Sequence, residues 1–142
     1  MSRRFVRSLP NLADRPGRVL ICEDSDELRA LLVSRLAMTG GIEVVGAVAD
    51  SASALEAIEQ LRPDAILLDL MTGDVDPNDT LQRLATIDAR PLVIVFSGLD
   101  PGALAPESRR TVDLHLDKTT PLRRVAEFVA DAITEHRAGE RL

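Results

Sequence analysis

The sequence predicts an α/β protein in which five strands form a doubly wound parallel sheet covered by five helices. Two observations lead to this fold class. Short apolar runs alternate along the chain with segments whose apolar residues recur at helical spacing, and short loops separate them. Residues 64–71 form an almost unbroken apolar run, which is typical of a strand buried between two layers of helices. Alternation with short loops favours right-handed crossovers and therefore a parallel sheet.

The first half of the chain is predicted to hold two strands, each followed by a helix. In order, these elements are expected at residues 18–22, 26–36, 42–49 and 51–62. Ser25 or Asp26 can cap the first helix, and Asp50 stands where it can cap the second. Gly40 and Pro63 follow the two helices, and both residue types end helices.

The second half is predicted to hold three strands and three helices. The strands are expected at residues 64–70, 91–96 and 112–116, and the helices at 80–87, 100–110 and from 121 to about 133. The middle helix is expected to be short or irregular because Pro101, Gly102 and Pro106 interrupt it. Pro121 is well placed for the first turn of the last helix. From Glu135 onward the chain is charged and is expected to fray.

Length and composition indicate one domain and exclude several function classes. We expect a flexible basic extension over residues 1–17, the domain over 18–137 and a tail over 138–142. A net charge of −6 and 2% aromatic residues argue against direct nucleic-acid binding. No apolar run approaches membrane-spanning length, so no membrane insertion is expected. The single cysteine, Cys22, is expected to be a buried core residue, and it favours a reducing, cytoplasmic setting.

Polar side chains that can bind a metal or take part in catalysis follow four of the predicted strands. They are Glu23 and Asp24 after the first strand, Asp69 after the third, Ser97 after the fourth and Lys118 after the fifth. Taken singly, each is also typical of a helix cap or a turn. Because the carboxyl ends of parallel strands share one edge of the sheet, we expect the five side chains to converge there.

Three carboxylates crowded at one edge repel one another unless a cation is present. Oxygen ligands favour a hard ion such as Mg²⁺, and no His or Cys cluster suggests a softer metal. A carboxylate beside Mg²⁺ and a lysine ammonium can attack a phosphoryl group, while a hydroxyl donates a hydrogen bond to the transferring oxygens. The sequence therefore predicts phosphoryl chemistry at this edge.

On these residues, the chain resembles the receiver domain of bacterial response regulators over residues 17–137. The resemblance implies a flavodoxin-like fold with strand order 2-1-3-4-5. It also implies a phosphoacceptor at Asp69, with Lys118 and Ser97 assisting. The metal ligands for Mg²⁺ would be Glu23, Asp24, Asp69 and the backbone carbonyl of Met71. The spacings from Asp24 to Asp69, Ser97 and Lys118 suit the family.

Three features depart from the family pattern. The loop over residues 71–79 contains Gly73 but lacks the glycine with which the family's loop motif usually ends. It also carries extra acidic residues, which can alter metal affinity or the partner surface. Lys118 is followed by Thr119, whereas the family commonly has Pro there. His115 occupies the position of the family's switch aromatic; it is either inert packing or a switch side chain whose rotamer follows phosphorylation and which responds to pH. His136 is expected to be exposed, without a phosphorelay role.

The resemblance predicts a stand-alone, non-enzymatic signalling receiver. A sensor histidine kinase or a histidine phosphotransfer protein would donate the phosphoryl group. Ser97 and His115 would then change the face made by the fourth strand, the irregular helix and the fifth strand, which would bind a downstream protein; the chain would be a monomer or a weak homodimer. Met71 and Leu99 flank the expected site and are apolar, so they are expected to hinder water and lengthen the lifetime of the phosphate.

Three other interpretations remain open. The chain can be a non-phosphorylated interaction module or the receiver fragment of a larger regulator. The third is a haloacid-dehalogenase-type phosphatase, but that family needs a second Asp two residues after the nucleophile, where this chain has Met71.

Overall fold

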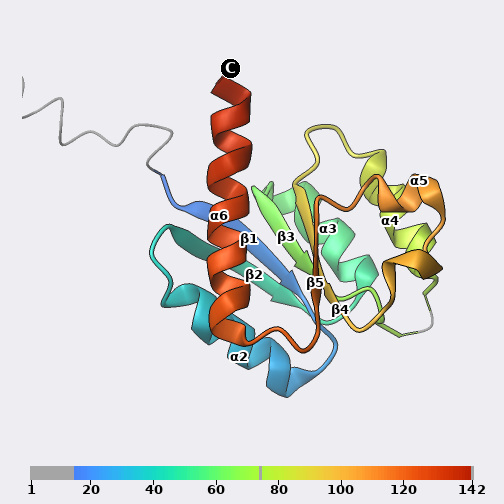
Figure 1. Ribbon diagram of the computed structural model, residues 1–142, viewed down its shortest axis with the longest axis horizontal. Helices are drawn as coiled ribbons and strands as arrows, with labels where there is room; N and C mark the ends of the chain where they lie inside the picture. The colour runs from blue at the N-terminus through green and yellow to red at the C-terminus, as the bar shows by residue number, and fades with distance from the viewer. Residues whose placement is uncertain (1–14, 74, 142) are drawn as a thin grey trace, which may run out of the picture.

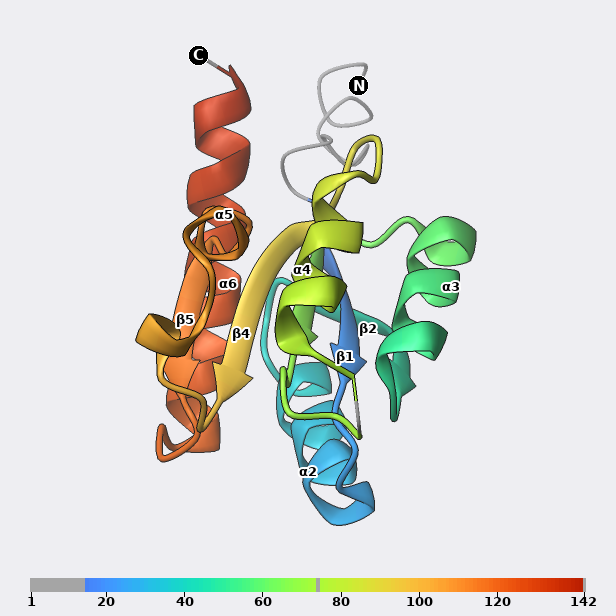
Figure 2. The ribbon, with the colours of Figure 1, turned by 90° about the vertical axis from the view of Figure 1, so that its right-hand side faces the viewer.

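The structure is a computed structural model that describes residues 15–73 and 75–141. Its five strands all run parallel in the order β2-β1-β3-β4-β5 (Figure 1), which confirms the predicted fold class. The strands are β1 (Gly17–Cys22), β2 (Ile42–Val48), β3 (Ala65–Leu68), β4 (Leu92–Ser97) and β5 (Leu114–Asp117). Because they run parallel, their carboxyl ends share one edge of the sheet, as the arrowheads in Figure 2 show.

Helices cover both faces of this sheet. They are α2 (Asp26–Ala37), α3 (Ser51–Leu61), α4 (Pro77–Ala85), α5 (Pro106–Arg109) and α6 (Leu122–Arg141), with a short 3₁₀ turn η2 (Pro101–Ala103) before α5. Residues of α2 and α6 pack with one face of the sheet, and residues of α3 and α4 pack with the other. Figure 2 shows α6 and α3 on opposite sides of the strands. None of the helices in the described part of the chain combines the length and apolar character needed to cross a bilayer.

Side-chain caps explain where three of these helices begin. Ser25 accepts a hydrogen bond from the Leu28 amide at the start of α2, and Asp50 accepts one from the Ser53 amide at the start of α3. Asp76 caps α4 in the same way and is followed by proline in the first turn. Such caps satisfy amide groups that have no partner within the helix.

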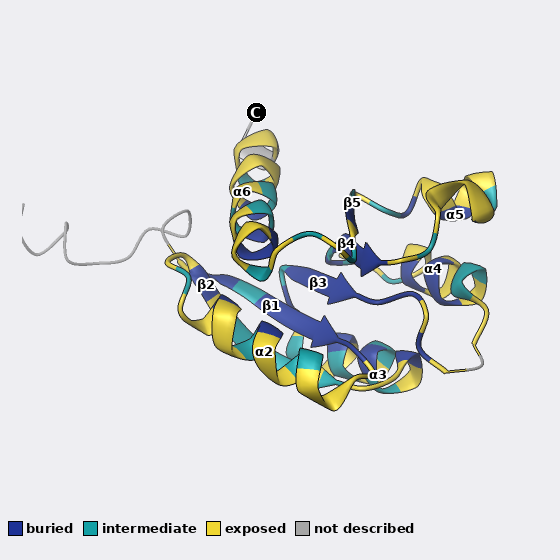
Figure 3. Ribbon diagram, turned by 60° about the horizontal axis from the view of Figure 1, so that its bottom comes forward, coloured by how far each residue is buried: buried dark blue, intermediate teal, exposed yellow. Residues whose placement is uncertain are grey.

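The core is aliphatic and lies on both sides of the central strands. Every residue of β3 is buried, and so are the last four of β1. Figure 3 shows β1 and β3 dark blue, whereas the helices expose one side to solvent. Cys22 is buried among the aliphatic residues on the α3 and α4 side, as predicted. Buried strands of this kind fix the sheet edge from which the polar side chains project.

Several element boundaries differ from those expected. The fifth strand begins at Leu114 rather than residue 112, because the Asp113 carboxylate itself accepts the Val93 amide at 2.8 Å. Helix α4 begins at Pro77, before the apolar stripe expected at residues 80–87, and ends at Ala85. The irregular helix expected over residues 100–110 is confirmed as the separate turns η2 and α5.

The end of the chain also differs. The last helix, expected to about residue 133, extends as α6 to Arg141. The Arg137 guanidinium donates to the carbonyl of Arg15 at 2.6 Å and to the Asp64 carboxylate at 3.2 Å. These contacts tie the last turns to the start of the sheet. Gly17 already belongs to β1, and residues 1–14 of the predicted basic extension lie outside the described residues.

Candidate functional site

The structure brings the acidic residues together at the carboxyl edge of the sheet. Glu23 and Asp24 follow β1, and Asp69 follows β3 by one position. One carboxylate oxygen from each lies within 4.8 Å of the others. Glu23 is only 2% exposed and Asp69 only 6%, whereas Asp24 is exposed. Two of the three carboxylates are therefore taken out of water while standing beside a third.

Lys118 supplies the positive charge between them. Its Nζ donates to Glu23 Oε1 at 2.6 Å and to Asp69 Oδ2 at 3.0 Å. It also lies 5.2 Å from the centre of the Phe96 ring. Burial alone lowers the pKa of Lys118, but hydrogen bonds and attraction from the two carboxylates outweigh it, so its pKa is raised. The amine is thus held in its charged form at neutral pH.

Main-chain and side-chain donors fix the orientation of the carboxylates. Ser25 donates its backbone N–H to Glu23 Oε2 at 3.0 Å, and Met71 donates its backbone N–H to Asp69 Oδ1 at 3.0 Å. Arg29 donates to the Glu23 carbonyl at 3.0 Å. Neither Ser25 nor Arg29 was predicted from the sequence to be part of this edge. The signal for Arg29 would have been its place one turn into the helix that follows Glu23.

Ser97 and His115 meet at a common neighbour, Leu99. The Ser97 side chain is fully buried, and its Oγ accepts the Leu99 backbone N–H at 3.2 Å. His115 Nε2 lies 3.2 Å from the Leu99 carbonyl oxygen. Both expected switch residues therefore contact the same peptide segment after β4.

Three other residues considered in the sequence analysis are Met71, Asp76 and His136. Met71 is 58% exposed, and its backbone carbonyl remains a predicted ligand. Asp76, one of the extra acids in the loop, caps α4. His136 lies on the exposed surface of α6, as expected.

The donor set fits a hard divalent cation. The three clustered carboxylates offer oxygen atoms only, and this is the ligand chemistry that Mg²⁺ prefers. Asp69 is at the same time the most buried aspartate of the group, with a lysine ammonium at hydrogen-bond distance. A carboxylate nucleophile, a cation site and an ammonium group are the parts that phosphoryl transfer to a carboxylate requires.

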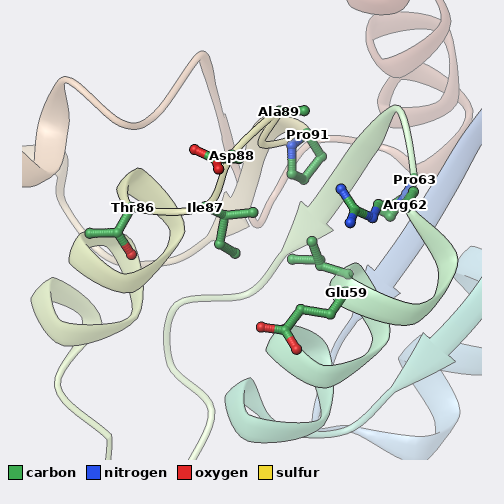
Figure 4. A pocket seen from close by; sticks show the side chains of 9 residues that line it. Glu59, Arg62, Pro63, Thr86, Ile87, Asp88, Ala89 and Pro91 are labelled. Atoms are coloured by element: carbon green, nitrogen blue, oxygen red, sulfur yellow. The ribbon is translucent and has the colours of Figure 1, made fainter.

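A cavity of about 550 Å³ lies at the other edge of the sheet and is separate from this cluster. It is bounded by the end of α3, which contributes Glu59 and Arg62, and by the segment after α4, which contributes Asp88 (Figure 4). Pro63 and Pro91, which precede β3 and β4, also line it, so the cavity belongs to the amino ends of the strands.

Comparison with known proteins agrees with this geometry. The sequence model of the response regulator receiver domain matches residues 19–124. The response regulator domain of Thermotoga maritima CheB is 26% identical, with a TM-score of 0.71 over 85% of this chain and 96% of that one. The REC domain of AraT, a response regulator from Geobacillus stearothermophilus, is 25% identical, with a TM-score of 0.71 over 89% and 98%.

Curated relatives with a similar sequence are longer proteins. A protein-glutamate methylesterase/protein-glutamine glutaminase of Xanthomonas oryzae pv. oryzae is 40% identical over 88 residues, which is 62% of this chain and 25% of that protein. The Rhizobium etli protein of that name is 32% identical over 90 residues, 63% of this chain and 26% of that protein. The chain thus spans about a quarter of the length of these relatives.

Proposed function

This chain belongs to the receiver domain family of response regulators, and on that premise we propose that it accepts a phosphoryl group on Asp69. Receiver domains are the signalling modules of two-component systems, and phosphorylation with Mg²⁺ is typical of the family. The observation that carries the proposal is the position of Asp69: it is 6% exposed, shares a cluster with two other acids and lies 3.0 Å from the Lys118 ammonium.

Glu23, Asp24 and Asp69 would hold the magnesium ion, with the Met71 carbonyl as a further ligand. When bound, the ion would neutralise negative charge on the phosphoryl oxygens and on the carboxylates. An Asp69 oxygen attacks the phosphorus of a phosphohistidine and forms the new P–O bond. The P–N bond breaks, and the imidazole nitrogen keeps the electron pair. Lys118, already shared with Glu23, can follow the developing charge on the phosphoryl oxygens.

The acyl phosphate would act on a two-state element at Ser97. Its hydroxyl holds the Leu99 amide, so a Ser97 that turns toward the phosphoryl group releases that segment. When the Leu99 segment is released, the Leu99 carbonyl oxygen that lies beside His115 Nε2 moves with it. The segments that respond are β4, the short turns η2 and α5, and β5, and we propose that they form the face that binds a downstream protein.

The proposed donor is a sensor histidine kinase or a histidine phosphotransfer protein. In this role the chain is a phosphorylated signalling protein, working in the cytoplasm as a monomer or weak homodimer without direct contact to nucleic acid. The buried free thiol of Cys22 suits that compartment. We expect the apolar side chains of Met71 and Leu99 to slow hydrolysis of the phosphate.

A second candidate is favoured by the curated relatives. The match to one part of longer methylesterase/glutaminase proteins suggests that this sequence can be the receiver part of a larger regulator. The length of the polypeptide produced from the native gene separates this candidate from a stand-alone receiver.

The proposal can be tested through the lysine, because Lys118 is the only lysine in the sequence. Protein labelled with ¹³C,¹⁵N-lysine gives one side-chain signal, which is expected to shift when beryllofluoride and Mg²⁺ are added. The Asp69→Asn variant, which keeps the shape of the site, is expected to show no shift. If the lysine signal of the unsubstituted protein does not shift when beryllofluoride is added, the non-phosphorylated interaction module is the better interpretation.

A further inference from the structure

Three hydroxyl side chains from separate parts of the chain meet below the surface, and one of them belongs to the loop that follows Asp69. Ser51 is the first residue of α3, Thr72 lies three residues after Asp69, and Thr80 belongs to α4. They are 6%, 2% and 4% exposed, respectively. The oxygens of Ser51 and Thr72 share a hydrogen bond of 3.0 Å, and Thr80 Oγ1 donates to Ser51 Oγ at 3.3 Å. We call these three residues the hydroxyl cluster.

Such a cluster is directional in a way that an apolar contact is not. A buried hydroxyl without a partner is costly, so each oxygen must stay within reach of another. Apolar side chains of similar volume would hold the two helices together without that geometric requirement. Ser51 is the common member of both hydrogen bonds, and α3 therefore fixes the positions of Thr72 and of α4 at once.

The segment between Asp69 and Gly73 is held by the buried residues on either side of Met71. Leu70 points into the core and is 4% exposed, but the next side chain, Met71, is 58% exposed. Gly73 turns the chain with a φ of +67°, a left-handed conformation that glycine adopts readily. Met71 thus has little packing of its own, and its peptide group is held between buried Leu70 and buried Thr72.

That peptide group touches the phosphoacceptor. The Met71 N–H donates to Asp69 Oδ1 at 3.0 Å, and Lys118 Nζ donates to Asp69 Oδ2 at 3.0 Å. The two donors together set the rotation of the carboxylate. The Met71 N–H belongs to the peptide group between Leu70 and Met71, so a shift of Thr72 would reach it through the Met71 backbone and loosen one of these two constraints.

We propose that Thr72, held by its hydrogen bond to Ser51, is a positioning residue that keeps the Asp69 carboxylate oriented for phosphoryl transfer. This inference rests on the proposed function of Asp69. The alternative is that the cluster only fastens α3 to α4. The two roles differ in which hydroxyl matters: the hydrogen bond that joins α3 to α4 is the one between Thr80 and Ser51, whereas positioning needs Thr72 above all.

Three variants separate these roles. Thr72→Val removes the hydroxyl next to Met71 with little change in shape. Thr80→Val is the matched control, because it removes a buried hydroxyl from the same cluster and leaves the Ser51–Thr72 hydrogen bond in place. Thr72→Ser restores the hydroxyl without the methyl group. Urea unfolding of all three gives the loss of stability against which the other effects are compared.

Two readouts are measured on each variant. The first is hydrogen exchange of the Met71 amide by NMR, without Mg²⁺ or any phosphoryl analogue. The second is the apparent dissociation constant for beryllofluoride in saturating Mg²⁺. In Thr72→Val we expect both the exchange rate and the dissociation constant to rise about fivefold, the equilibrium equivalent of one hydrogen bond. In Thr80→Val and Thr72→Ser both should stay within about twofold of the unsubstituted protein.

Equal effects of Thr72→Val and Thr80→Val, in proportion to their losses of stability, would overturn the positioning role. An unchanged Met71 exchange rate in Thr72→Val would overturn it as well. If the unsubstituted protein takes up no beryllofluoride, the proposed function of Asp69 fails, and the positioning role, which rests on it, is overturned with it. If the unsubstituted protein binds beryllofluoride and Thr72→Val has the same dissociation constant, only the positioning role is overturned.

Discussion

Replacing Lys118 with methionine should make the protein less stable and, at the same time, a tighter ligand for Mg²⁺. The substitution keeps an aliphatic side chain and removes the ammonium group, which lies 5.2 Å from the centre of the Phe96 ring. Glu23, which is 2% exposed, then loses its ion pair, and Asp69 loses its own. The three carboxylates remain within 4.8 Å of one another with no lysine between them.

The expected loss of stability in metal-free buffer is about 3 kcal/mol, the lower end of what breaking a buried ion pair costs. It is at the lower end because the Lys118 side chain is 29% exposed and because Ser25 and Met71 still donate to the two carboxylates. Removal of a neighbouring positive charge should lower the dissociation constant for Mg²⁺ roughly tenfold. A saturating excess of the ion, about 100 times its dissociation constant, would return about 2.7 kcal/mol.

Urea unfolding with EDTA and with Mg²⁺, together with calorimetric titration of Mg²⁺, measures both effects. Arg124→Met is the matched control, since its ion pair with Glu127 has side chains 50% and 48% exposed, and it should cost less than about 1 kcal/mol. Because the pKa of Lys118 is raised on folding, its contribution should be complete below the ordinary value of 10.5 and disappear as the pH rises through the folded pKa. A Lys118→Met protein that keeps its stability in EDTA, or that binds Mg²⁺ more weakly, would refute this reasoning.

Three further predictions concern single titratable groups. Burial, followed by the charge of Asp50, raises the pKa of Cys22 to about 12, so the thiol should resist alkylation near neutral pH until urea unfolds the protein; equal rates with and without urea would contradict this. The Ser53 amide and hydroxyl lower the pKa of Asp50 below its ordinary 3.8, so this carboxylate stabilises the fold at neutral pH and stops doing so as the pH falls through the folded pKa. The stability lost in Asp50→Asn should therefore shrink in acid, and a pH-independent loss would argue against the cap. His115→Phe removes the contact with the Leu99 carbonyl, so release of that segment costs less and beryllofluoride should bind more tightly; an unchanged dissociation constant would make His115 inert packing.

The periodicity of the sequence predicted the sheet and its helices because each strand buries an unbroken or β-branched apolar run. It failed where a side chain took over a main-chain role. The Asp113 carboxylate accepts the Val93 amide, so β5 starts two residues later than its pattern suggests. The contacts of Arg137 with Arg15 and Asp64 extend α6 past the expected end, and they join residues too far apart in sequence for any local pattern to reveal.

The candidate site was predicted through the same topology. Once the strands are known to run parallel, residues at their carboxyl ends must share an edge, and this placed Glu23, Asp69 and Lys118 together. The hydroxyl cluster was not foreseen, because Ser51 and Thr72 are ordinary cap and loop residues in sequence. Only the placement of α3 and α4 on the same face of the sheet brings such side chains together below the surface.

The most direct test of the account is to find which residue takes up a phosphoryl group. The protein is incubated with acetyl phosphate and Mg²⁺, its intact mass is measured, and borohydride reduction marks the acyl phosphate for peptide mapping. We predict the gain of a single phosphoryl group, mapped to residue 69 and absent from Asp69→Asn and from samples with EDTA. A phosphoryl group on any other residue, or one that the Asn variant still acquires, would contradict the assignment of Asp69.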